Sequence, residues 1–262
     1  MSRYARMFER LGGEGAFGAF LMLGDPDVET SARLLDAAVE GGADMIEVGI
    51  PFSDPVADGP VIQAAAQRAL AAGVTVTDCF RLLGAFRARH AEVPVGILTY
   101  ANIVRARGGF MKDAAEAGAD SLLIADVPSL EAEPFVREMI QAGIEPVLIA
   151  AANSPPAILE RVAALSKAYT YCVSRAGITG THVGGQFDSG LIGRVEAAGA
   201  PPAVFGFGIA KPEHVAAALL AGAKGVICGS AIVDCAARGG DVTELVRSMK
   251  AATRERLGAA MN

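Results

Sequence analysis

Three carboxylates lie close together in a stretch whose pattern could support chemistry. Glu47 stands inside the apolar run "MIEVGI" (45–50), and Asp54 and Asp58 follow in the loop "PFSDPVADGP" (51–60). Burial raises the pKa of a carboxyl group, which suits a general acid or base. We therefore predict that Glu47 transfers protons. Asp58 in "ADGP" also fits an ordinary turn residue, and Asp54 in "SDP" fits loop structure better than catalysis.

Glycine-rich segments form a second candidate site. "GFGI" (206–209) and "CGSAIV" (228–233) each end an apolar run, and the second also begins a helical pattern. Glycine lets backbone N–H groups approach an anion, and the N-terminus of a helix favours negative charge. With the Ser230 hydroxyl and "ITG" (178–180) on a third side, we predict a phosphate site. Neither glycine segment contains Lys or Arg, so its donors would be neutral.

Bulky side chains at the ends of the apolar runs fit either plain core or the walls of a pocket for a flat apolar ligand. They are Phe20, Leu98, Tyr100, Leu123, Ile149, Tyr171 and Phe207.

Repeated units of helix and strand must position these residues. A helix end, a glycine and a short apolar run recur, as in "EGGADMIEVGI" (40–50) and "EAGADSLLIAD" (116–126). Continuous apolar runs of this length are typical of strands buried on both faces of a parallel sheet. We expect eight such strands, at 19–23, 45–49, 95–100, 121–125, 146–150, 168–173, 203–207 and 225–228.

Helical patterns separate these strands, for example at 28–40, 76–89, 130–141, 155–165 and 212–220. Eight such units predict a single (β/α)₈ TIM-barrel domain over residues 1–262, whose site lies at the C-terminal ends of the strands. "MSRYARMFERL" adds an N-terminal amphipathic helix, and a short helix follows the eighth strand. An open dinucleotide-binding sheet has weak support, because no GxGxxG follows the first strand.

Composition narrows the classes of function. The 262 residues carry a net charge of −6, which argues against nucleic acid as a partner. The sequence contains no run of eighteen apolar residues, so it predicts no membrane span, and the N-terminus lacks the apolar core of a secretory signal. The cysteines at 79, 172, 228 and 235 form no CxxC pair, and the three histidines are scattered. We expect reduced thiols, no metal site and a cytoplasmic location.

Seven motifs occur in an order that matches a known family: "LGDPD", "EVGIPFSDPVADGP", "YAN", "ADVP", "YTYCVSRAGITG", "GFGI" and "CGSAIV". From about Phe17 to Val233 the chain resembles the alpha subunits of tryptophan synthase, and "PFSDPxADGP" is the most specific of these motifs. The resemblance implies retro-aldol cleavage of indole-3-glycerol phosphate to indole and glyceraldehyde 3-phosphate, within tryptophan biosynthesis.

The resemblance also implies roles for individual residues. Glu47 would protonate indole C3 and accept the hydroxyl proton, Asp58 would stabilise the indole N–H, and Tyr171 would assist near the reacting carbon. The phosphate would be bound by Gly180, Phe207, Gly208, Gly229 and Ser230. The indole would lie among Phe20, Leu98, Tyr100, Leu123 and Ile149.

Loop closure and a partner follow from the same resemblance. Thr179 and Arg175 would close the loop after the strand at 168–173, with Thr179 bonding to Asp58. Pro51, Asp54 and Asn102 would contact a beta subunit in an alpha-beta-beta-alpha complex. The alpha chain would need no cofactor, because pyridoxal phosphate belongs to the beta partner. The sequence departs from many relatives at "AAANSP" and "THVGGQFDSG", which concerns loop behaviour more than the chemistry.

Other functions remain open on the same fold. A free-standing indole-releasing lyase would be highly active without a partner, and a phosphosugar isomerase would ignore indole compounds. A silent activating subunit would not need the two carboxylates Glu47 and Asp58. A Schiff-base aldolase would need a lysine inside the barrel, whereas all five lysines fall outside the C-terminal ends of the expected strands.

Overall fold

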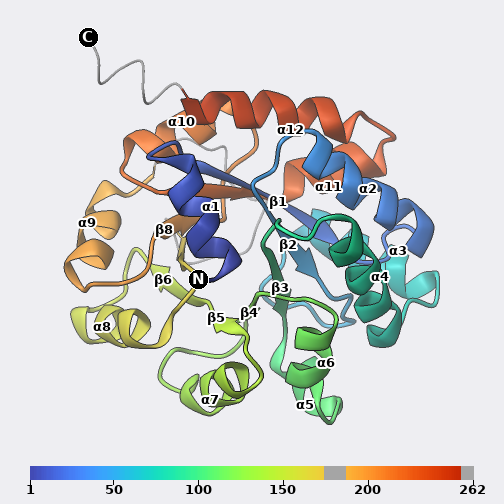
Figure 1. Cartoon of the computed structure of the whole chain (residues 1–262), viewed down its shortest axis with the longest axis horizontal. Coiled ribbons are helices and arrows are strands. Elements are labelled where there is room, and N and C mark those ends of the chain that lie inside the picture. Colours follow the sequence, from blue (N-terminus) through green and yellow to red (C-terminus); the bar gives the residue numbers. More distant parts are fainter. Residues whose placement is uncertain (174–186, 255–262) are drawn as a thin grey trace.

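A computed structural model describes residues 1–173 and 187–254, and a single parallel sheet organises them (Figure 1). The strand order is β5-β4-β3-β2-β1-β9-β8-β7-β6. The strands are β1 (Ala16–Met22), β2 (Met45–Gly49), β3 (Val95–Thr99), β4 (Ser121–Ile124), β5 (Glu145–Pro146), β6 (Leu148–Ala151), β7 (Thr170–Val173), β8 (Ala203–Phe205) and β9 (Gly225–Cys228). Helices surround this sheet, so the predicted TIM barrel is confirmed.

The fifth predicted strand is divided, which explains nine strands where eight were expected. β5 pairs with β4 and β6 pairs with β7, and only Val147 separates the two. The amide of Leu148 donates to Ser166 Oγ at 3.2 Å, just before β7. One barrel strand therefore pairs with β4 through its first part and with β7 through its second part, and the sheet stays nearly closed.

The helices begin where the sequence offers caps. Asp27 caps α2 by accepting from the amide of Thr30, and Thr75 and Asp78 form a capping box at α4. The helices are α1 (Arg3–Leu11), α2 (Val28–Glu40), α3 (Pro60–Ala71), α4 (Val76–Arg89), α5 (Ala101–Ala106), α6 (Phe110–Glu116), α7 (Glu133–Gln141), α8 (Pro156–Leu165), α9 (Ser189–Ala197), α10 (Pro212–Leu220), α11 (Ser230–Ala237) and α12 (Val242–Ala251). A short 3₁₀ turn, Ala252–Arg254, follows α12.

Most predicted boundaries hold, and the exceptions are local. The first strand begins at Ala16 instead of Ala19, and the helix expected from Leu130 begins at Glu133. The strand expected to reach Phe207 ends at Phe205, although the amide of Gly206 still donates to the carbonyl of Cys172 at 3.4 Å. The N-terminal helix and the short helix after the last strand are both present.

Two apolar layers surround the sheet, one inside the barrel and one beneath the helices. Along β2, Met45 belongs to the inner layer, whereas Ile46 and Val48 belong to the outer one. Successive side chains of a strand point to opposite faces. Glu47 therefore points into the barrel.

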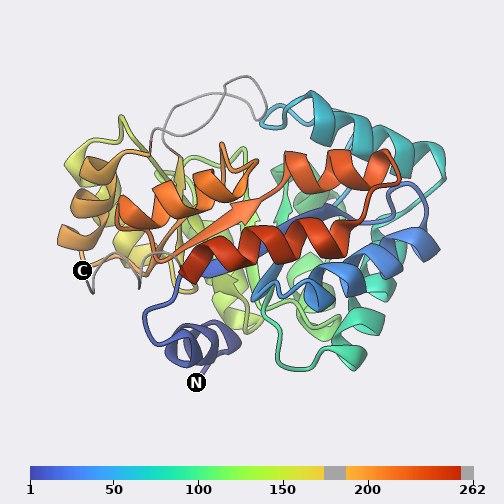
Figure 2. The ribbon, with the colours of Figure 1, turned by 90° about the horizontal axis from the view of Figure 1, so that it is seen from above.

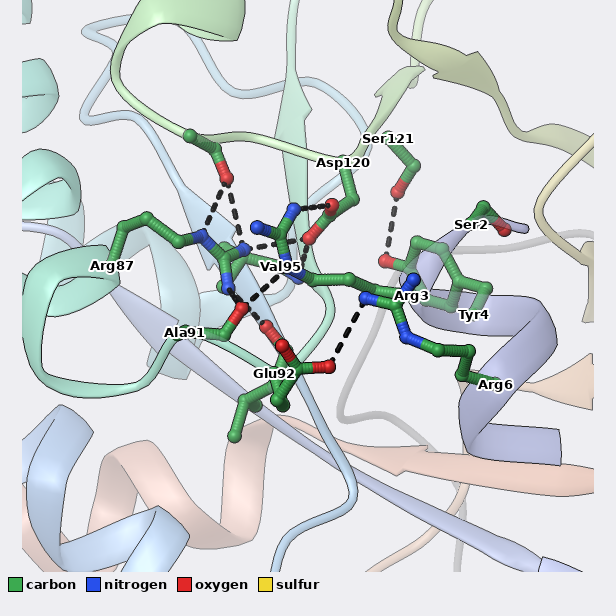
Figure 3. A network of polar contacts seen from close by, with 12 residues as sticks. Ser2, Arg3, Tyr4, Arg6, Arg87, Ala91, Glu92, Val95, Asp120 and Ser121 are labelled. Carbon is green, nitrogen blue, oxygen red and sulfur yellow. Dashed lines mark hydrogen bonds and ion pairs between the residues drawn. The ribbon is translucent and has the colours of Figure 1, made fainter. Parts of the chain in front are cut away.

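Helix α1 covers the end of the barrel at which the strands begin (Figures 1 and 2). Arg3 donates to Asp120 Oδ1 at 2.7 Å and Arg87 donates to Asp120 Oδ2 at 2.6 Å. The same carboxylate accepts from the amide of Val95 at 2.8 Å (Figure 3). Asp120 thereby joins α1, α4 and the start of β3. Because α1 covers this end of the barrel, a site is expected at the opposite end, where the strands end.

No single helix in residues 1–173 and 187–254 is long and apolar enough to cross a membrane. Helices α3 and α4 pass that test only together, as a pair bent by 103°. The four cysteines are free thiols, as expected, although Cys235 is only half-buried.

Candidate active site

Glu47 is the buried carboxyl group at the centre of the site. Its side chain lies inside the barrel, and the residue is 3% exposed. Tyr169 Oη donates to Glu47 Oε1 at 3.0 Å. Burial raises the pKa of Glu47 to about 8; the bond from Tyr169 opposes this rise, and the nearby charge of Asp58 adds to it. The carboxyl group can therefore both hold and release a proton near neutral pH.

Tyr169 and Tyr4, which support Glu47 from the end of the barrel covered by α1, were not identified from the sequence. Tyr169 precedes β7, and its ring packs against that of Tyr4 from α1, with centroids 5.4 Å apart. Tyr4 Oη is 2.9 Å from Ser121 Oγ, and either oxygen can donate (Figure 3). A Cβ atom at Gly96 would lie 2.7 Å from Ser121 Oγ and 3.0 Å from Tyr4 Oη. The glycine therefore makes room for the side chains of Tyr4 and Ser121. In the sequence, Tyr169 opens the motif "YTYCVSRAGITG" but was given no role.

Asp58 lies on the loop between β2 and α3 and is 8% exposed. Tyr100 Oη donates to Asp58 Oδ2 at 2.8 Å and accepts from the amide of Ala57 at 3.2 Å. Gln63 Nε2 donates to the carbonyl of Asp58 at 2.7 Å. Burial raises the pKa of Asp58, and the bond from Tyr100 opposes that effect. Tyr100, expected as a pocket wall, is thus also a tether for this carboxylate.

Tyr171 lies inside the barrel on β7 and is 3% exposed. Its ring meets that of Phe207 edge to face, with centroids 5.9 Å apart. A Cβ atom at Gly206 would lie 1.9 Å from Tyr171 Cζ and Oη. Gly206 therefore gives Tyr171 its place, a role that the "GFGI" motif alone did not indicate.

The expected indole-binding side chains share one apolar cluster inside the barrel, apart from Tyr100. Phe20 and Leu123 are buried, and Leu98, Ile149 and Phe207 are half-buried. Phe20 pairs with Glu47 in the register of β1 and β2. The structure therefore brings Glu47 and these apolar side chains together.

The expected phosphate-binding residues follow two adjacent strands, β8 and β9. Gly208 has φ +82°, a backbone conformation that favours glycine, and nothing lies within 4 Å of the position of a Cβ atom there. Gly229 is the N-cap of α11, whose first residue is Ser230. The helix N-terminus and an open glycine suit an anion. Gly180, expected on the third side, lies outside the described residues.

The residues expected to contact a beta subunit differ in exposure, and those expected to close a loop are not described. Asp54 and Asn102 are exposed, whereas Pro51 is buried. Val56, on the same loop, is 71% exposed and was not singled out in the sequence. Arg175 and Thr179 lie outside the described residues. Within the described part of the chain, no group of three His, Cys, Asp or Glu side chains is arranged to hold a metal ion.

Comparison of the sequence with known proteins shows the family to which the chain belongs. The sequence model of the family "Tryptophan synthase alpha chain" matches residues 8–261. The chain belongs to the tryptophan synthase alpha chain family. It is 49% identical to the alpha chain of Shewanella amazonensis over 239 residues, covering 89% of this chain and 90% of that one. It is 46% identical to the alpha chain of Proteus mirabilis over 266 residues, covering 97% and 99%.

Solved structures of tryptophan synthase share the fold. The alpha subunit of Legionella pneumophila superposes with a TM-score of 0.87 at 29% identity, covering 97% of this chain and 99% of that one. A chain of Mycobacterium tuberculosis tryptophan synthase gives 0.87 at 31% identity, covering 97% and 98%. As a tryptophan synthase alpha chain, the protein is a carbon–carbon lyase of tryptophan biosynthesis that cleaves indole-3-glycerol phosphate.

Proposed function

We propose that this chain, as one domain over residues 1–262, cleaves indole-3-glycerol phosphate by general acid–base catalysis with Glu47. Protonation of indole C3 by Glu47 turns the ring into a good leaving group. Glu47 then accepts the proton of the neighbouring side-chain hydroxyl. The bond to C3 breaks, its electron pair restores the indole ring, and the aldehyde of glyceraldehyde 3-phosphate forms. The observation that carries this proposal is a carboxyl group, buried inside the barrel, with a pKa raised to about 8.

Asp58 stabilises the positive charge that develops on the ring nitrogen when C3 is protonated. Its carboxylate acts as a fixed anion for the indole N–H, because Tyr100 and Gln63 hold the residue at its side chain and its carbonyl. A preorganised charge in a poorly solvated site stabilises a transition state without further rearrangement. Tyr171, buried on β7 beside Phe207, contacts the substrate near the reacting carbon.

The phosphate binds to backbone amides around Gly208 and Gly229 and to the hydroxyl of Ser230. The open space at Gly208 and the N-terminus of α11 support this placement, together with Phe207 on the same loop. The chemistry needs no cofactor in this chain. Arg175, Thr179 and Gly180 keep the loop and phosphate roles that the family resemblance implies.

The variants Glu47→Gln and Asp58→Asn test these roles. Each should reduce indole release from indole-3-glycerol phosphate by at least a hundredfold. General acid–base catalysis, lost in Glu47→Gln, contributes about 10²–10⁴ in rate, and one preorganised electrostatic contact, lost in Asp58→Asn, contributes about 10²–10³. Circular dichroism and binding of glycerol phosphate should stay unchanged. Asp54→Asn, on the same loop but exposed, is the matched control and should keep its activity. Near-normal turnover in either catalytic variant would disprove the role of that residue.

The partner is a pyridoxal-phosphate beta subunit, in an alpha-beta-beta-alpha complex located in the cytoplasm. Exposed Asp54, Val56 and Asn102 support a contact surface on the loop after β2 and on α5 after β3. A Val56→Asp variant should bind a purified beta subunit more weakly in ultracentrifugation, while indole release by the alpha chain alone stays the same. Unchanged binding would place the contact elsewhere.

A further inference from the structure

The wall of the barrel is open between β4 and β6. Pairing between β4 and β5 ends at Leu122 and Pro146, and the amide of Val147 makes a last bond to Leu122 O at 3.0 Å. From Leu148 onward the chain pairs with β7. The C-terminal parts of β4 and β6 therefore diverge on the side covered by α7 (Figure 1).

A cavity of about 310 Å³ occupies this opening. Leu123 and Ile149 line it from the inner apolar layer, and Ile124 and Leu148 belong to its walls as well. Val136 and Met139 of α7 line it from the outer apolar layer. The cavity thus passes through the wall, and it shares Leu123 and Ile149 with the proposed indole pocket. Glu47, Asp58 and Tyr171 do not line it.

The lining of the cavity selects for a neutral ligand. Among the described residues that line it, the one charged side chain is that of Asp126, whose Oδ1 accepts from the amide of Ala101 at 2.8 Å. None of these described lining residues is cationic, so they offer no counter-charge to a phosphorylated molecule. Arg161 Nε donates to the carbonyl of Ser129 at 2.7 Å and holds the loop that forms one wall. The cavity is therefore largely preformed, as small-molecule sites usually are.

We infer that this cavity is a second binding site for a small neutral aromatic molecule, and that indole released in the adjoining pocket is its occupant. Apolar cavities of about 150 Å³ bind benzene, so the observed volume is ample for indole. The choice of indole as occupant rests on the proposed function. The cavity itself rests on the divergence of β4 and β6.

The test is indole binding to the full chain after its catalytic pocket has been saturated with indole-3-propanol phosphate. This analogue lacks the hydroxyl groups needed for cleavage and occupies the indole and phosphate subsites together. We expect calorimetry to show one further indole bound per chain. A crystal soaked with 5-bromoindole and the analogue should place the bromine signal between Leu123, Ile149 and Val136.

Val136→Phe fills the cavity from α7 and should weaken this second binding at least tenfold while indole release stays within twofold. Ala157→Phe, at an exposed position of α8, is the matched control and should change neither. Absence of indole binding to the analogue-saturated chain would overturn the inference, as would unchanged binding in Val136→Phe. If Val136→Phe fails to fold, the bromine position in the unaltered chain decides. Loss of cleavage activity bears on the proposed function alone, whereas the bromine position tests only the cavity.

Discussion

Replacement of Tyr169 by phenylalanine should raise the pKa of Glu47. In the folded chain the phenol donates a hydrogen bond to Glu47 Oε1 at 3.0 Å and so favours the ionised carboxylate. Phenylalanine keeps the ring that packs against Tyr4 but removes the donor. The carboxylate then loses stabilisation, the protonated form does not, and the group holds its proton to a higher pH.

The size of the effect follows from the kind of bond removed. A hydrogen bond to a charged group contributes about 1.5–3 kcal/mol, and one pKa unit corresponds to about 1.4 kcal/mol. The pKa of Glu47, already raised to about 8, should therefore rise by about one to two units. Because burial is the largest cause of the existing rise, removal of its main opposing contact is expected to show clearly.

Carbon-13 NMR of the chain labelled at glutamate carboxyl groups measures this pKa directly. The spectrum of Glu47→Gln identifies the Glu47 signal by its absence. Its chemical shift is then followed from pH 5 to pH 11 in the unaltered chain and in Tyr169→Phe.

Tyr4→Phe is the matched control. Its hydroxyl is paired with Ser121 Oγ rather than with the carboxylate, so its removal should move the Glu47 pKa much less. An unchanged or lowered pKa in Tyr169→Phe would refute the reasoning. An equal shift in both variants would show that the packing of Tyr4 and Tyr169, and not the hydrogen bond from Tyr169, sets the pKa of Glu47.

Further predictions concern stability and packing. Glu47→Gln should be more stable than the unaltered chain by up to about 4–5 kcal/mol at pH 8. Ionisation of Glu47 stabilises the unfolded chain above pH 4.5, whereas in the folded chain the group keeps its proton to about pH 8. Urea titrations of both proteins at pH 4 and pH 8 measure this difference. Gly206→Ala should displace Tyr171, 1.9 Å from the new Cβ, and lower indole release with loss of stability, whereas normal activity would remove the packing argument. Asp120→Ala should cost about 3–5 kcal/mol of unfolding free energy, because half-buried Arg87, Arg3 and the amide of Val95 all lose the same carboxylate; a loss below 1 kcal/mol would contradict this.

Short-range patterns in the sequence were sufficient for the order of strands and helices and for the burial of Glu47. Continuous apolar runs after glycine predicted the parallel barrel, and a carboxylate between Ile46 and Val48 predicted a buried carboxyl group. These inferences succeed because strand periodicity and desolvation depend on residues a few positions apart. The motif "PFSDPVADGP" added the family, which the comparisons confirm.

Only the tertiary structure showed what holds Glu47 and Asp58. Tyr169 bonds to a carboxylate 122 positions away, and Tyr100 bonds to Asp58 across 42 positions. Such contacts depend on the register of the barrel and on α1 docking beneath it, which no local pattern encodes. The division between Pro146 and Leu148 was hidden for the same reason. The sequence shows one continuous apolar run, and the choice between two neighbouring strands is made only when the barrel closes.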